Sequence, residues 1–143
     1  MQDFGKSTLG VSLLETMLVL AIATLVIVST ARYYQSAIQN TQATQFTKQM
    51  YGFTAAVETL TQGKGNYASL TLAQITAILP ANAMSLPWGG APAIGTNTTG
   101  YAVTLSAPYP AVGTCNLITQ RLTTDKHYTV TGTCQQFVYN ANI

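Results

Sequence analysis

Few side chains in this sequence could carry acid–base or metal chemistry. Among its 143 residues, the carboxylates and the only histidine are Asp3, Glu15, Glu58, Asp125 and His127. A chain with so few titratable groups has little with which to transfer protons in a reaction. The sequence therefore disfavours hydrolases, kinases and metalloenzymes, and we expect no catalytic residue, no metal site and no cofactor.

Composition places the chain among apolar proteins of one small domain. Charged residues make up 7% of the sequence, against about 25% in ordinary globular domains. Hydrophobic residues make up 48% and the mean hydropathy is +0.23, so polar disorder does not explain the low charge. The net charge of +2 is too small and scattered for a nucleic-acid surface. We expect no direct nucleic-acid site.

The apolar excess is concentrated near the N-terminus, in residues 11–31, which read VSLLETMLVLAIATLVIVSTA. As a helix this segment spans about 31 Å, the thickness of the hydrocarbon layer of a bilayer. No proline or glycine interrupts the chain between Val11 and Tyr51. A secretory signal would end in a small-residue cleavage site, and Val28 and Ser29 make a poor one. The pattern predicts a retained membrane helix.

Glu15 is the residue that does not fit this apolar helix. A carboxylate in lipid costs several kcal/mol unless it is interfacial, paired or protonated. One interpretation places Glu15 in the head-group zone, where it complements the positive end of the helix dipole. The other is that it awaits a positive partner from another subunit. The composition alone leaves both open.

The N-terminus as a whole resembles the class III signal of type IV pilins. A short leader with a lysine, MQDFGKSTLG, ends in Gly10, and Glu15 is the fifth residue of the chain that starts at Val11. The resemblance implies that prepilin peptidase cleaves between Gly10 and Val11, and that Val11 becomes the N-methylated first residue. It also implies that Glu15 pairs with a neighbouring subunit's terminal amine and sets the assembly register.

Departures from the family pattern point to a subgroup. Type IVa pilins usually begin with Phe and carry a proline in the apolar helix, whereas this chain has Val11 and no proline before Pro80. It looks most like the type IVb group of thin-pilus, bundle-forming and toxin-coregulated pilins, although the leader, residues 1–10, is shorter than is typical there. The order of turn, proline loop and cysteine in Leu86–Gly90 and Tyr109–Leu117 is similar too.

The segment after the membrane helix, residues 32–62, is predicted to continue as an amphipathic helix. Apolar residues recur at helical spacing on one face: Phe46, Met50, Phe53, Val57 and Leu60. The opposite face carries Gln45, Lys48, Gln49 and Thr59. Packing of a small head on this face is the simplest interpretation, and Gly63 is the expected end of the helix.

Residues 63–143 are expected to form that head. A short helix is predicted over 72–79, capped by Ser69 or Thr71 and stopped by Pro80, and a turn with two glycines over 86–90. A further helix is expected over 116–122. Strand-like runs occupy residues 91–94, 101–106, 127–131 and 136–139. The predicted fold class is α+β, with an antiparallel sheet against the long helix.

Cys115 and Cys134 are the only cysteines. Without a Cys-x-x-Cys pair or a second histidine, a zinc site is disfavoured, and outside the cytoplasm a disulfide is the natural interpretation. In type IV pilins such a bridge encloses a surface that makes subunit or host contacts. Here that loop holds four polar residues, for which a solvated face is the simpler interpretation: Arg121, Asp125, Lys126 and His127.

Three functions follow from different classes of protein. By resemblance, the first is a homo-oligomeric filament, assembled by pilus machinery from the inner membrane and exposed outside the cell to host surfaces or other cells. The second is a minor pilin or a type II secretion pseudopilin, whose major form carries calcium-binding acidic loops that Glu58 and Asp125 cannot make. The third, an enzyme or ligand-binding membrane protein, is disfavoured by the scarcity of titratable groups.

Overall fold

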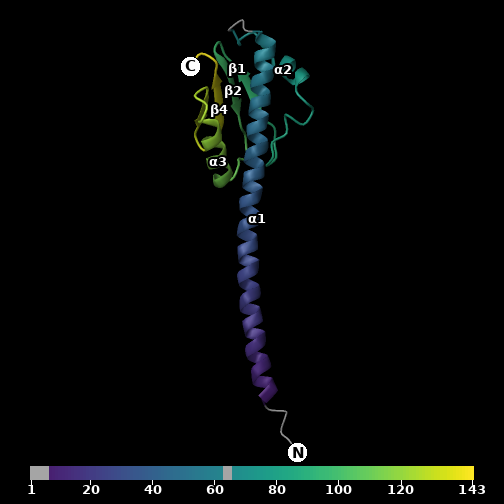
Figure 1. The fold of residues 1–143 in the computed structure, drawn as a ribbon. Coiled ribbons are helices and arrows are strands. Elements are labelled where there is room, and N and C mark those ends of the chain that lie inside the picture. Colours follow the sequence, from purple (N-terminus) through teal and green to yellow (C-terminus); the bar gives the residue numbers. More distant parts are fainter. Residues whose placement is uncertain (1–6, 63–65) are drawn as a thin grey trace, which may run out of the picture. The chain divides into compact units, whose positions relative to one another are not determined.

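The structure is a computed structural model that describes residues 7–62 and 66–143, with the backbone alone for residues 7–11. The chain divides into two compact units, Met1–Ala37 and Ile38–Ile143. The first helix, α1 (Ser7–Thr61), runs through both. The second unit adds two helices and a four-stranded sheet, drawn in Figure 1: α2 (Leu72–Ile78), α3 (Val112–Leu122), β1 (Ala93–Thr96), β2 (Gly100–Thr104), β3 (Tyr128–Thr131) and β4 (Gln136–Asn140). The predicted α+β class is confirmed.

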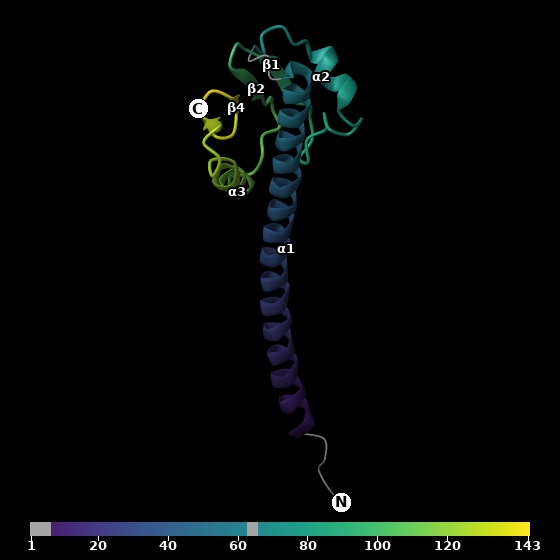
Figure 2. The ribbon, with the colours of Figure 1, turned by 45° about the horizontal axis from the view of Figure 1, so that its top comes forward.

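The amphipathic half of α1 provides the core of the second unit. Its predicted apolar stripe is confirmed, because Phe46, Met50, Phe53 and Val57 are at most 1% exposed and Leu60 packs against them partly buried. Figures 1 and 2 show α2 and α3 on opposite sides of this half of α1. Gln62, just after the helix, has a positive φ of 45°. The expected cap at Gly63 lies outside the described residues.

The sheet is antiparallel throughout, in the order β1-β2-β4-β3. Its register puts Tyr101 of β2 and Tyr128 of β3 on either side of Tyr139 of β4, and Val103 opposite Phe137. All five side chains are buried, so the period-two alternation of the strands directs one face into the core.

Glycine is required where β2 begins. A Cβ at Gly100 would lie 1.9 Å from the carbonyl oxygen of Tyr139 in the paired strand. No side chain fits that space, because real contacts of a Cβ are longer than 3 Å. The close approach of these two strands therefore depends on Gly100.

The short elements differ from the prediction mainly at their ends. Thr71 is the N-cap of α2, in a reciprocal capping box with Gln74, and Gly89 and Gly90 have positive φ as the predicted turn requires. The strand predicted over 91–94 is instead β1, Ala93–Thr96. Pro92 has no N–H to give to a ladder, so pairing begins at the next residue.

The helix expected over 116–122 is longer than predicted. Helix α3 begins at Val112, and the Cys115 amide already donates to the Ala111 carbonyl at 2.9 Å. Gly113 and Thr114 are weak helix formers, so the sequence pattern predicts a later start, but tertiary packing overrides such preferences. Thr114 is fully buried. Cys115 therefore lies inside the helix and does not open it.

Three buried tyrosines fasten the sheet to α1. The Tyr101 hydroxyl donates to the Met50 carbonyl at 3.0 Å, and Thr54 bonds the hydroxyls of both Tyr101 and Tyr128. The Tyr139 hydroxyl donates to a Glu58 carboxylate oxygen at 2.6 Å. Burial raises the pKa of all three phenols above the ordinary 10.0, and at Tyr139 the hydrogen bond and charge of Glu58 raise the pKa further.

We expect the second unit to lose stability above pH 10. Below that pH the phenols are neutral in both states and their contribution is complete. Above it the unfolded tyrosines ionise, while Tyr101, Tyr128 and Tyr139 in the folded unit keep their protons to a higher pH. Over that interval each of them lowers the free energy of unfolding by up to about 1.4 kcal/mol per pH unit. An ultraviolet titration should show three of the eight tyrosines ionising only as the fold is lost. Ionisation of all eight in the folded protein would contradict this.

Candidate assembly and binding sites

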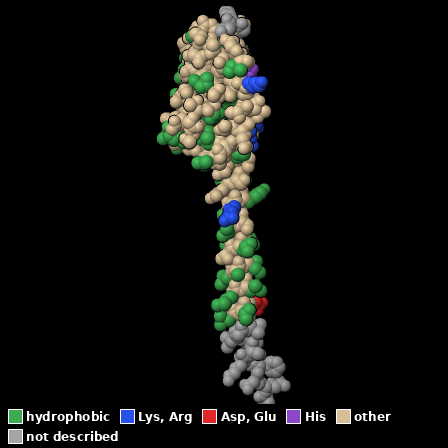
Figure 3. All heavy atoms as spheres, turned by 90° about the vertical axis from the view of Figure 1, so that its left-hand side faces the viewer, with side chains coloured by type: hydrophobic (Ala, Val, Ile, Leu, Met, Phe, Trp, Pro, Cys, Tyr) green, Lys and Arg blue, Asp and Glu red, His purple; other side chains and the backbone are tan. Residues whose placement is uncertain are grey.

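The apolar segment of α1 in the first unit presents hydrophobic side chains on every side. Leu13, Leu14, Leu25 and Ile27 are between 59% and 73% exposed, and Figure 3 shows hydrophobic side chains gathered along this part of the helix. Within the described residues, α1 is the one helix long and apolar enough to cross a membrane. A helix that is apolar all round is compatible with anchoring in lipid.

Hydroxyl groups in this segment are satisfied within the helix itself. Thr16 and Thr24 donate to carbonyls three residues earlier at 2.9 and 2.8 Å, and Ser29 and Thr30 to carbonyls four residues earlier at 2.7 Å. This back-bonding removes the cost of placing a hydroxyl in hydrocarbon. These four serine and threonine residues are therefore compatible with a membrane helix.

Glu15 has no such hydrogen-bond partner within the helix. Along the part of the chain that the structure describes, it makes no ion pair or hydrogen bond, and it shares a shallow hollow on the side of α1 with Ser12, Thr16, Val19 and Leu20. The next charged residue, Arg32, stands 17 positions further on, more than four helical turns away. Among its described residues, the first unit thus presents one carboxylate, on an apolar helix, with no cation close enough to meet it.

The residues expected at the cleavage point are only partly described. Gly10 and Val11 fall within α1 by their backbone, whereas the side chain of Val11 and residues 1–6 of the expected leader are not described. Cleavage and N-methylation at Val11 stay predictions.

The two cysteines are joined. Cys115 of α3 and Cys134, in the turn before β4, form a disulfide with a Cα–Cα distance of 5.8 Å. Cys134 is fully buried and has a positive φ of 58°. The bridge ties α3 to the strand pair β3–β4 and closes the loop that holds the four polar residues.

Replacing both cysteines by serine should destabilise the second unit by about 3 kcal/mol, because a cross-link across 19 residues removes loop-closure entropy from the unfolded chain. Denaturant unfolding of the detergent-solubilised chain, oxidised and as the double variant, measures the difference. A change below about 1 kcal/mol would mean that the unfolded chain is already compact in this region.

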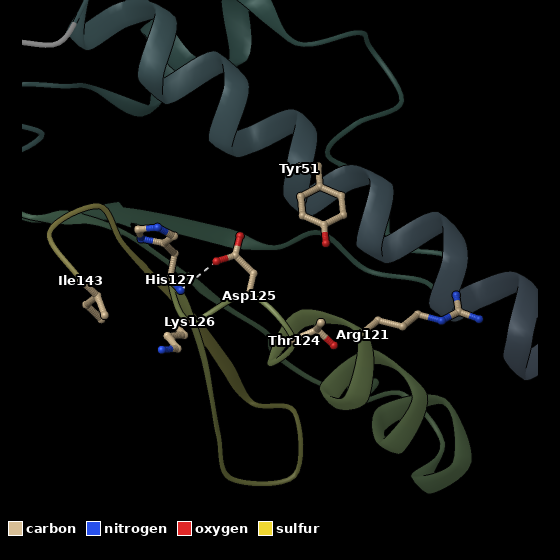
Figure 4. Close-up of a pocket in the computed structure, with 7 residues that line it drawn as sticks. All are labelled: Tyr51, Arg121, Thr124, Asp125, Lys126, His127 and Ile143. Atoms are coloured by element: carbon tan, nitrogen blue, oxygen red, sulfur yellow. Dashed lines mark hydrogen bonds between the residues drawn. The ribbon is translucent and has the colours of Figure 1, made fainter.

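The four polar residues of the disulfide loop are brought together in one place. Arg121, Asp125, Lys126 and His127 line a hollow of about 660 Å³ with Tyr51, Thr124 and Ile143; Figure 4 shows the seven side chains. Sequence reasoning missed Tyr51, which comes from α1, 70 residues before Arg121. Among the described residues, no three His, Cys, Asp or Glu side chains are grouped to hold a metal ion.

Comparison with known proteins gives no assignment. No protein-family model matches the chain, and neither a curated protein nor a solved structure is similar to it at a significant level.

Proposed function

We propose that this chain is a structural subunit of a type IV pilus and acts in adhesion, aggregation or conjugation. In this proposal the leader is removed between Gly10 and Val11, and Val11 is methylated. The subunit waits in the inner membrane through residues 11–31 and then joins a surface filament by packing this helix against those of other copies. Its role is structural, without catalysis or a cofactor.

The observation that carries the proposal is the combination, within the described residues, of a wholly exposed apolar helix and an unpaired carboxylate on it, Glu15. Exposed apolar side chains such as Leu14 and Leu25 can be covered either by lipid or by other apolar helices. Glu15 is costly in lipid and has no partner on its own described helix, so a permanent anchor gains nothing from it. A filament core in which a neighbour's amine meets Glu15 accounts for both features.

The second unit supports the same proposal. Its core is closed by the amphipathic half of α1, with Phe46, Met50 and Phe53 fully or almost fully buried. One continuous helix therefore supplies an apolar assembly surface and the centre of a folded head, as a polymer with exposed heads requires.

The deciding experiment is mass spectrometry of filaments sheared from cells that produce this chain. The proposal expects filaments by electron microscopy, built of a subunit that begins at Val11 and carries one added methyl group. An abundant subunit would identify the main component, and a trace amount would favour the alternative of a minor pilin or a type II secretion pseudopilin. A chain retained in the membrane with residues 1–10 uncut, and no filaments, would contradict the proposal.

A further inference from the structure

We propose that the hollow beside the disulfide loop binds an acidic saccharide, a sugar that carries a carboxylate as well as ring hydroxyls. We call it the loop hollow; it has a volume of about 660 Å³, within the usual range for small-molecule sites and large enough for more than one sugar ring. All of its lining belongs to the unit Ile38–Ile143. The proposal does not depend on filament assembly.

Tyr51 gives the loop hollow an aromatic wall. Tyr51 is 45% exposed, and its ring meets the Tyr128 ring edge-on, with centroids 5.8 Å apart. Tyr128 is itself buried and held by Thr54 through its hydroxyl. The Tyr51 ring is thus supported on one side and open on the other. An open aromatic ring of this kind packs well against the C–H face of a sugar while its hydroxyl stays in water.

Two acceptors for sugar hydroxyls stand near this wall. One Asp125 carboxylate oxygen accepts a hydrogen bond from the backbone N–H of His127 at 3.0 Å. This bond fixes the carboxylate and leaves its second oxygen to accept from a sugar hydroxyl. The His127 ring donates from Nδ1 to the Asn140 carbonyl at 2.8 Å, so in the neutral ring Nε2 is an acceptor. In Figure 4 both side chains come from the segment after α3, with Tyr51 across from them on α1. Each is oriented by the protein before a ligand arrives.

The charges of the loop hollow select for an anion. Among the side chains that line it, Arg121 and Lys126 are basic and Asp125 is the one acidic side chain. Arg121 is fixed to α1, donating to Thr44 at 2.7 Å and to Asn40 at 3.4 Å, and Lys126 is exposed. None of the three takes part in an ion pair within the described ranges. A ligand carboxylate can therefore approach Lys126 without displacing an existing partner.

Together these features favour a saccharide over a simple anion. An inorganic anion needs only the cations, and Asp125 would repel it. A sugar acid uses all three parts, since its carboxylate meets Lys126, its hydroxyls donate to Asp125 and His127, and its C–H face covers Tyr51.

The test is saturation-transfer NMR of the full-length chain in detergent micelles, titrated with methyl β-D-glucuronide and with its neutral counterpart, methyl β-D-glucoside. We expect a Kd on the order of 1 mM for the glucuronide, as befits a single small ring, and at least threefold weaker binding of the glucoside. Lys126→Gln should remove the preference for the acid, and Tyr51→Ser should weaken both sugars at least tenfold. Lys48→Gln, an exposed lysine elsewhere on α1, is the matched control and should change nothing.

Three results would overturn the proposal. These are no saturable binding of the glucuronide at about ten times that Kd, equal binding to Lys126→Gln and the original chain, or displacement of the glucuronide by an equal concentration of sodium acetate. Both key positions are exposed, so the variants should fold, and unchanged fluorescence of Trp88, the one tryptophan, verifies this. Filaments are not measured, so failure here leaves the proposed function standing.

Discussion

Replacing Glu15 by valine is expected to abolish filaments and leave insertion of the chain in the membrane intact. Valine removes a carboxylate from an otherwise apolar helix, so the isolated subunit becomes easier to insert. In the filament the same change would leave a neighbour's amine buried without a counter-charge. Breaking a buried pair in this way costs about 3–5 kcal/mol. This lowers the association constant of each subunit contact more than a hundredfold.

The measurement compares sheared filaments with the amount of subunit in the membrane fraction. Thr16→Val is the matched control, because it removes the polar side chain of the next residue. The Thr16 hydroxyl already donates to the Leu13 carbonyl within the helix. This control should assemble normally. Undiminished filaments from Glu15→Val would remove the register role and favour the other interpretation, in which Glu15 lies in the head-group zone and complements the helix dipole.

The periodic part of the core could be predicted from the sequence, and its small members could not. Phe46, Met50 and Phe53 recur at helical spacing and are large, so their common face is evident from the order of the residues alone. Ala43 and Thr47 are buried to the same degree or nearly so, yet alanine and threonine are common on both faces of a helix. Their burial follows from how closely the sheet and α3 approach α1, which no local pattern encodes.

In the candidate binding site, too, the sequence could predict some residues and not others. Arg121, Asp125, Lys126 and His127 are close in sequence, so they can be recognised as one polar group without the fold. Tyr51 enters their hollow only because the sheet packs on α1 in one particular register, fixed by contacts such as that of Tyr101 with the Met50 carbonyl. The grouping of these four side chains in one loop could be predicted, whereas a binding role was not the simpler interpretation and the aromatic wall required the tertiary structure.

Truncating Phe46 to alanine is expected to lower the free energy of unfolding of the second unit by about 3–5 kcal/mol, a large share of what small domains possess. Phe46 is fully buried, and its ring lies 4.8 Å from that of Phe137 and 5.2 Å from that of Trp88. It therefore joins α1 to the sheet on one side and to the turn after α2 on the other. Neither neighbour can fill the space left by the ring without leaving its own contacts, so a cavity term adds to the loss of buried area.

Denaturant unfolding of the full chain in detergent, with the disulfide intact, measures this effect. Trp88 is the only tryptophan, so its fluorescence reports the packing around Phe46 directly, and near-ultraviolet circular dichroism of the tyrosines checks that the unit unfolds in one step. Val112→Ala is the matched control, since this residue is apolar, in the same unit and 75% exposed, and should shift stability by less than about 0.5 kcal/mol. A loss below about 1 kcal/mol for Phe46→Ala would mean that the sheet is held to α1 mainly by the tyrosine hydroxyls and not by the apolar stripe.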